Sequence, residues 1–491
     1  MKTSKIETLK NGSTTLSQDS ANRNFPPGFL WGAATSHFQI EGYTSEMQSR
    51  LSDWSSWMMS PSNIIDGSNA EQACDFLNRY LDDISLMESL NLNAFRISIN
   101  WPAILIDAPG TAGVAQQLDP EGVEYYRRVL STLKERGIKT FVTLFHFCLP
   151  TWLADQGGWN NPLSAEQFGT FTTLVVDAFG EYVDYWLTIN EPMAYVYQGY
   201  VSGQWTPGLK NDYLAAFGVV RNMLVGHAAA YQAIKAKYPN APVSFTNHWR
   251  PFIPEQPLSP LDHAVCMVRD NIFNQLFPQS IQTGVFKVPP PLGLYKVLRL
   301  LEGPIPGLKG SMDYLGINYY TRELSRFKAA WPIDPFGEAS DKTQFKTNAL
   351  GWETYPEGLY QVLTRDIRPY RYNTDGSLRE IFITENGYAE KFERHLDEGD
   401  WSLEDSERVD YLVRHVKVIH DAIAAGVPVR GYLHWSLLDN FEWAEGLQQR
   451  FGLVRVTYPN QTRAPRKSAY VYADIAASNA LNKDLLLKHP S

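Results

Sequence analysis

The chain has 491 residues, of which 44% are hydrophobic and 20% charged, as in a globular protein that buries a substantial core. The formal net charge of -9 and the lack of a Lys- or Arg-rich block argue against nucleic acid or an anionic membrane as a partner. No apolar run approaches the roughly 18 residues of a membrane span, so we expect no membrane partner.

The cysteine pattern and the N-terminal residues indicate the cellular compartment of the protein. Cys74, Cys148 and Cys266 are few and scattered, which fits neither a disulfide framework nor a metal site and suits a reducing compartment. Residues 1–24 are polar and rich in Ser, Thr and Asn, without the apolar run of a secretory signal. We therefore predict a cytoplasmic protein with a disordered tail over residues 1–24.

Short apolar or β-branched runs alternate with segments of helical periodicity along the rest of the chain. The predicted strands cover residues 29–36, 94–99, 139–146, 185–191, 242–248, 314–320, 380–384 and 429–436. The predicted helices cover residues 70–90, 121–136, 164–181, 213–238, 259–282, 355–368 and 406–426.

This alternation indicates parallel βαβ units, and eight of them favour a single closed (β/α)8 TIM barrel of the α/β class. A doubly wound open sheet is the competing arrangement, but residues 31–36 (WGAATS), after the first strand, lack a Gly-rich phosphate loop. We interpret the long connections over residues 250–313 and 322–351 as loop insertions at the C-terminal face of the barrel.

Each predicted strand ends in, or just before, residues suited to binding or chemistry. In chain order these are Gln39, Arg96 with Asn100 and Trp101, His146, Asn190 with Glu191, Asn247, Asn318 with Tyr320, Glu385 with Asn386, and Trp435. Any one of them alone has a structural explanation, since Asn is common where a strand turns into a loop. Such residues occur at the ends of all eight predicted strands. This indicates one shared site, because barrel active sites lie at the carboxyl ends of the strands.

Two glutamates, Glu191 and Glu385, end apolar strand-like runs. A carboxyl at the end of a buried strand is unfavourable unless it is paired or put to use. Two such carboxyls brought together would supply the proton donor and the nucleophile that cleavage of a glycosidic bond needs.

The strings around both glutamates resemble motifs of the family 1 glycoside hydrolases, the β-glucosidase family. TINEP at residues 188–192 resembles T-[FIL]-N-E-P, and ITENG at residues 383–387 resembles [IV]-T-E-N-G. Further similar segments are residues 25–41 (FPPGFLWGAATSHFQIE), 95–101 (FRISINW), 314–321 (YLGINYYT) and 435–453 (WSLLDNFEWAEGLQQRFGL). The resemblance implies that residues 25–485 form one (β/α)8 glycoside hydrolase catalytic domain.

The resemblance also implies roles for individual residues. Glu191 matches the general acid/base and Glu385 the nucleophile of a retaining β-glycosidase. Positions that match contacts to the sugar in the cleaved-side subsite are Gln39, His146, Asn190, Glu442 and Trp443, with Trp435 as aromatic floor and Phe451 as its apolar neighbour. Arg96, Asn318 and Tyr320 match residues around the nucleophile, and Trp352 matches a position that often stacks on the leaving group. The resemblance implies no cofactor and no metal.

Elementary electrostatics agrees with these roles. Arg96 would favour the ionised form of Glu385, and the Tyr320 hydroxyl would hydrogen-bond it. An ionised Glu385 would then keep Glu191 protonated, ready to donate to the leaving oxygen. One departure from the family is Phe147, where Trp is common after the histidine, and it removes one indole donor to the sugar.

The sequence thus predicts a retaining β-glycosidase that hydrolyses terminal β-D-glucosyl residues of small β-glucosides or oligosaccharides, with tolerance for β-galactosyl or β-fucosyl residues. A 6-phospho-β-glycosidase is the nearest alternative, but Glu442 would repel a phosphate. A myrosinase-like thioglycosidase would have Gln in place of Glu191. A non-catalytic sugar-binding protein on the same barrel is the third alternative, although such relatives usually lose one carboxylate. A homo-oligomer is left open.

Overall fold

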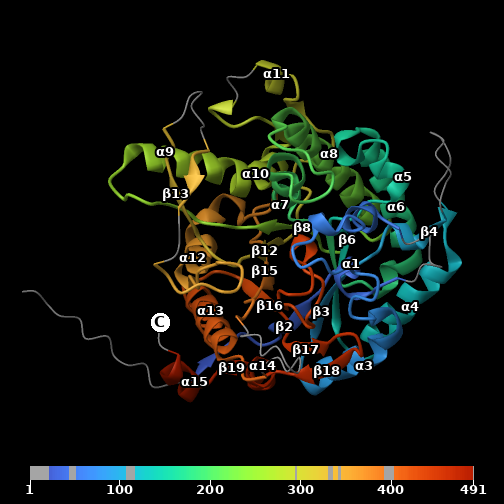
Figure 1. Ribbon diagram of the computed structural model, residues 1–491, viewed down its shortest axis with the longest axis vertical. Coiled ribbons are helices and arrows are strands. Elements are labelled where there is room, and N and C mark those ends of the chain that lie inside the picture. The colour runs from blue at the N-terminus through green and yellow to red at the C-terminus, as the bar shows by residue number, and fades with distance from the viewer. Residues whose placement is uncertain are drawn as a thin grey trace, which may run out of the picture.

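The computed structural model describes residues 22–43, 51–106, 117–292, 296–329, 336–340, 344–391 and 403–489. These residues fold around a closed barrel of eight parallel strands with helices outside it (Figure 1). The barrel strands are β2 (Leu30–Ala34), β3 (Ala94–Ser98), β6 (Lys139–Phe145), β7 (Tyr185–Asn190), β8 (Val243–His248), β12 (Leu315–Asn318), β15 (Ile381–Asn386) and β16 (Val429–Trp435). They pair in chain order, and β16 pairs with β2 to close the ring, so the predicted (β/α)8 fold is confirmed.

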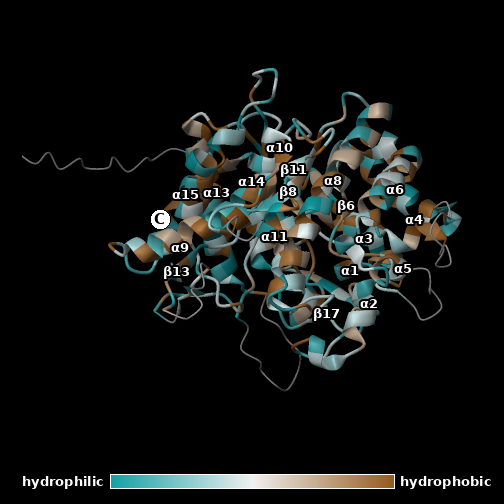
Figure 2. Cartoon of the chain, turned by 90° about the horizontal axis from the view of Figure 1, so that it is seen from above, coloured by the Kyte–Doolittle hydropathy of each residue, from teal (hydrophilic) through white to brown (hydrophobic). Residues whose placement is uncertain are grey.

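Helices cover the outside of the barrel, and in Figure 2 they carry both polar and apolar residues. The long ones are α3 (Phe76–Ser89), α4 (Pro120–Glu135), α6 (Leu163–Phe179), α8 (Tyr213–Lys237), α13 (Ser406–Ala424) and α14 (Lys467–Ser478), the last without a sequence prediction. In α4 the Asp119 side chain accepts from the first backbone N–H groups, and Pro120 follows it, a strong helix start. Val123, Leu130 and Leu133 of α4 are buried at helical spacing, which holds the helix on the barrel.

Two predicted helices are interrupted. Residues 259–282 form α9 (Pro260–Arg269) and α10 (Leu276–Thr283), joined by a π-helical turn over Asp270–Gln275. Residues 355–368 form α12 (Pro356–Gln361), which continues into a π-helical turn over Val362–Asp366. Each π turn adds a residue to the helical repeat and so changes the face that the next helical turn presents to the barrel.

The two long insertions pair with each other. A three-stranded sheet joins β9 (Phe252–Pro254) of the first insertion with β13 (Glu323–Arg326) and β14 (Glu338–Ala339) of the second. The other short elements are α1 (His37–Ile40), α2 (Asp53–Met58), α5 (Thr151–Ala154), α7 (Pro192–Val196), α11 (Lys296–Arg299), α15 (Lys483–Lys488), β4 (Leu105–Ile106), β5 (Gln117–Leu118), β10 (Val285–Phe286), β11 (Gly303–Pro304), β17 (Val454–Thr457) and β18 (Thr462–Pro465).

The two ends of the described chain meet. Strand β1 (Arg23–Asn24) pairs antiparallel with β19 (Ala480–Leu481), so these two residues, assigned to the tail from the sequence, belong to the fold. Residues 1–21 of the predicted tail lie outside the described residues. Among the described residues, no helix is long and apolar enough to cross a membrane.

A separate apolar cluster fills the barrel beneath its carboxyl end. It includes Phe141, Leu187, Phe382 and Leu433, which come from four different barrel strands. Arg96 lies fully buried in the same barrel, where only a charged partner can balance its guanidinium.

Candidate active site

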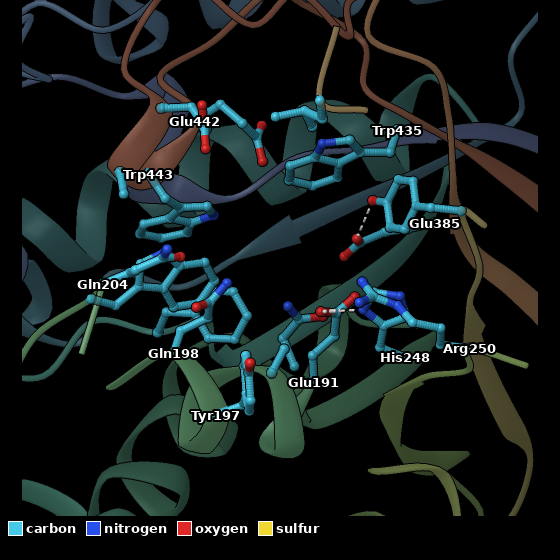
Figure 3. Close-up of a pocket in the computed structure, with 18 of the residues that line it drawn as sticks. Glu191, Tyr197, Gln198, Gln204, His248, Arg250, Glu385, Trp435, Glu442 and Trp443 are labelled. Carbon is cyan, nitrogen blue, oxygen red and sulfur yellow. Dashed lines mark hydrogen bonds and ion pairs between the residues drawn. The ribbon is translucent and has the colours of Figure 1, made fainter. Parts of the chain in front are cut away.

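A pocket of about 180 Å³ opens where the barrel strands end (Figure 3). This is smaller than the roughly 300–1,000 Å³ of drug-sized ligand sites. The predicted site residues that line it are His146, Asn190, Glu191, Tyr320, Trp352, Glu385, Trp435, Glu442, Trp443 and Phe451. The other three, Gln39, Arg96 and Asn318, do not line the pocket but hydrogen-bond residues that do.

Glu385, at the end of β15, is held by two donors. Its Oε1 forms an ion pair with Arg96 Nη1, and its Oε2 accepts from the Tyr320 hydroxyl at 2.7 Å. Arg96 is itself fixed, because it also donates to Asn190 Oδ1 at 2.7 Å and to Thr143 Oγ1 at 3.0 Å. A fixed, fully buried guanidinium favours negative charge on the carboxyl beside it.

Glu191 follows β7 at the sharp turn into α7. Its φ of 38° is in the left-handed region, which is uncommon for a residue with a side chain and clusters at functional sites. Asn318 Nδ2 donates to Glu191 Oε1 at 2.6 Å, and His248 Nδ1 lies 3.3 Å from Oε2. Glu191 therefore interacts with a neutral amide and with an imidazole.

The two carboxyls influence each other's protonation. Burial raises the pKa of Glu385 to about 7, and the charge of Glu191 adds to this, while Arg96 and Tyr320 oppose it. Burial acts in the same direction on Glu191, but His248 and Asn318 outweigh it and lower the pKa. Because the groups titrate as a pair, they share one proton near neutral pH. Arg96 forms its ion pair with Glu385, so the negative charge of the pair is favoured on Glu385 and the shared proton on Glu191.

A third carboxyl, Glu442, lies on the opposite side of the pocket from Glu191 (Figure 3). Its Oε2 accepts from Gln39 Nε2 at 3.2 Å, and burial followed by the charge of Glu385 raises its pKa to about 8. Gln39 Oε1 and His146 Nδ1 are buried polar atoms without a hydrogen-bond partner. Buried polar groups normally find partners, so these atoms indicate a ligand rich in hydroxyl groups.

Aromatic rings form the pocket walls. The ring of His146 lies nearly parallel to those of Trp435 and Trp443, with centroids 6.0 Å apart in both pairs. Trp352 packs against Tyr320 at 5.3 Å. Flat apolar faces suit the C–H side of a pyranose ring.

Among the pocket residues outside the predicted site are His248, Arg250 and Trp205. The residue singled out on that strand was Asn247, but its amide donates to the Asn274 carbonyl at 3.1 Å, away from the pocket. Neighbouring strand residues face opposite sides, so the choice between Asn247 and His248 needed the register that only the barrel provides.

Three other strand-end residues do not line the pocket and instead make contacts that stabilise the fold. Asn386 donates to the Tyr319 carbonyl at 2.6 Å, and Trp101 stacks on Phe171 with centroids 4.6 Å apart. Asn100 accepts from the backbone of Ala103 at 3.3 Å.

Known proteins resemble this chain over nearly its whole length. The family model for glycosyl hydrolase family 1 matches residues 21–481. The chain is 34% identical to β-glucosidase A of Thermotoga maritima over 94% of this chain and 99% of that protein. It is 30% identical to β-glucosidase A of Acetivibrio thermocellus over 93% of this chain and 98% of that protein. The solved family 1 β-glucosidase from T. maritima has a TM-score of 0.83 and 32% identity, covering 94% and 99% of the two chains.

A closed (β/α)8 barrel with two carboxyls facing one pocket at its carboxyl end is the framework of a retaining glycosidase. The chain belongs to glycosyl hydrolase family 1. The family and the β-glucosidase type of activity predicted from the sequence are thereby confirmed.

Proposed function

We propose that Glu191 and Glu385 cleave terminal non-reducing β-D-glucosyl residues from small β-glucosides or oligosaccharides. The observation that supports these roles is the unequal environment of the two carboxyls. Glu385 contacts a fixed cation and a hydroxyl donor, whereas Glu191 contacts a neutral amide donor and an imidazole.

In the first step, Glu191 donates its proton to the glycosidic oxygen while a carboxylate oxygen of Glu385 attacks the anomeric carbon. The bond between the anomeric carbon and the leaving oxygen breaks, and a covalent glycosyl-enzyme forms. Arg96 and Tyr320 hold the Glu385 carboxylate in position.

In the second step, the glycosyl ester on Glu385 carries no charge, so Glu191 no longer faces a negative neighbour and is stable as a carboxylate. It accepts a proton from water, whose oxygen attacks the anomeric carbon and releases Glu385. Two inversions leave the sugar with its original β configuration.

Sugar selection is proposed to depend on Gln39, His146 and Glu442. A neighbouring structure from T. maritima contains galacto-hydroximolactam, which supports the proposed tolerance for β-galactosides. A second carboxyl, Glu445, lines the pocket beside Glu442, so this wall offers a 6-phosphate carboxyl groups and no cation.

The test is release of p-nitrophenol from the β-D-glucoside, the β-D-galactoside, the β-D-fucoside and the glucoside 6-phosphate. We expect the plain glucoside to be cleaved and the 6-phosphate to be poor. In Glu191→Gln, cleavage of a β-linked disaccharide should fall by about 10²–10⁴-fold, the contribution of general acid catalysis, with a smaller loss on the nitrophenyl glucoside. Equal losses on both substrates would contradict the acid role of Glu191.

We further propose that the protein is cytoplasmic and that Cys74, Cys148 and Cys266 stay reduced there. All three are buried and free of disulfide bonds, which suits a reducing compartment. Cell fractionation tests the location, and light scattering of the purified protein tests whether it forms a homo-oligomer.

A further inference from the structure

The pocket that contains Glu191 and Glu385 is called the sugar pocket below. A second cavity, of about 500 Å³, adjoins it. The two cavities share Tyr197, Arg250 and Phe273 in their walls. In Figure 3, Tyr197 and Arg250 lie on the Glu191 side of the sugar pocket, where the leaving group departs. A group attached to the glycosidic oxygen therefore has this cavity as its neighbour.

The second cavity has largely apolar walls. Phe217 and Val220 come from α8, Phe252 from β9 and Ile272 from the π turn after α9. The rings of Phe252 and Phe273 meet edge to face at 6.0 Å. These flat surfaces suit an aromatic ligand, which gains from edge and stacking contacts.

The charged groups of this cavity already have ion-pair partners. Glu323 Oε2 lies 3.3 Å from Arg250 Nη1, and Glu323 also forms an ion pair with Arg269. Arg269 Nε donates to the Phe336 carbonyl at 2.6 Å. The sugar pocket has unpartnered buried atoms on His146 and His248, whereas in the second cavity the unpartnered charged-group atom, Arg250 Nε, lies on the wall that the two cavities share. The sugar pocket is thus built for hydroxyl groups, and the second cavity for an apolar group.

We propose that this cavity receives a flat, multi-ring aromatic aglycone, so that the preferred substrates are aryl β-glucosides with extended ring systems. The inference rests on the proposed function, because it assigns the leaving group of the same reaction. The Arg250 guanidinium lies 5.6 Å from the Phe273 ring centre, and this pair forms the edge over which the aglycone passes.

The experiment compares kcat/KM for a three-ring flavonoid β-glucoside and for β-D-glucosyl fluoride, whose leaving group is too small to reach the second cavity. Val201→Trp adds bulk to the cavity wall, and Phe252→Ala removes an aromatic surface from it. Each should lower kcat/KM for the flavonoid glucoside by about tenfold, the effect of losing 1.4 kcal/mol of binding, and leave the fluoride unchanged. Val285→Trp, on an exposed valine outside both cavities, is the matched control and should change neither value.

Unchanged flavonoid turnover in both variants, or equal losses on the two substrates in both, would overturn the assignment of this cavity. Wild-type enzyme that fails to hydrolyse β-D-glucosyl fluoride would refute the proposed function itself. Hydrolysis of the fluoride, together with flavonoid turnover that does not depend on Val201 and Phe252, would refute only the aglycone site.

Discussion

Replacing Glu442 by glutamine should stabilise the protein at alkaline pH while impairing catalysis. Burial, reinforced by the charge of Glu385, raises the pKa of Glu442 from an ordinary 4.5 to about 8. Because the folded-state pKa is above the unfolded-state value, ionisation of Glu442 opposes folding. The stability of the wild type relative to the glutamine variant is therefore highest below pH 4.5 and falls as pH rises through about 8.

The size of this effect follows from the pKa. A rise from 4.5 to about 8 corresponds to about 5 kcal/mol once the carboxyl is ionised in both states. Glutamine keeps one acceptor for the hydrogen bonds from Gln39 and Trp435 but loses the other, which costs about 1 kcal/mol. We expect Glu442→Gln to be more stable by up to about 4 kcal/mol at pH 8.5 and nearly unchanged at pH 5.

Urea unfolding of both proteins at the two pH values measures the difference, beside kcat/KM for the nitrophenyl glucoside. The catalytic value should fall by about 10–100-fold, because one of the two acceptor oxygens for sugar hydroxyls is lost. Glu124→Gln, the same change on an exposed carboxylate, is the control and should show no pH-dependent gain. A shift in unfolding midpoint that is the same at pH 5 and pH 8.5 would refute the reasoning.

Three further predictions concern the carboxyl pair and the fold around it. Glu385→Gly should abolish hydrolysis but couple α-glucosyl fluoride to an acceptor sugar, seen by chromatography; a folded variant that forms no coupled product contradicts the nucleophile role. His248→Asn removes a group that lowers the pKa of Glu191, so the alkaline limb of the kcat/KM profile should move to higher pH, and an unmoved limb would exclude an influence of His248. Arg466→Met leaves the fully buried Asp439 carboxylate without its closest cation and should destabilise the fold by about 3–5 kcal/mol in urea, whereas adding Asp439→Leu should recover part of the loss.

The barrel and most of the site could be predicted from the sequence because both follow from local patterns. Each barrel strand is a short buried run, and residues such as Glu191 and Glu385 come directly at its end. Once eight strands are parallel and closed, their ends must meet on one rim. The position of such residues therefore needs no knowledge of longer-range contacts.

Features that depend on register or on distant pairing could not be predicted. His248 and Asn247 are adjacent, and only the closed barrel determines which of them faces Glu191. The π turn over Asp270–Gln275 adds one residue to a helical repeat, a change that periodicity alone does not reveal. The second cavity depends on the pairing of β9 with β13, which connects two insertions far apart in the sequence.

The closure of the barrel between β2 and β16 has a consequence for synthesis of the chain. At about 5–20 residues per second, translation separates the two strands by roughly 20–80 s, and until then β2 has an unpaired edge. The hydrogen bond from Gln39 to Glu442 crosses the same seam, and the Tyr472 hydroxyl lies 2.8 Å from the Gly32 carbonyl and 2.9 Å from the Tyr432 carbonyl. The sugar pocket is therefore assembled last, and a ribosome-bound chain that stops short of β16 has an open sheet of seven of the eight barrel strands, with an exposed strand edge that neighbouring nascent chains can join.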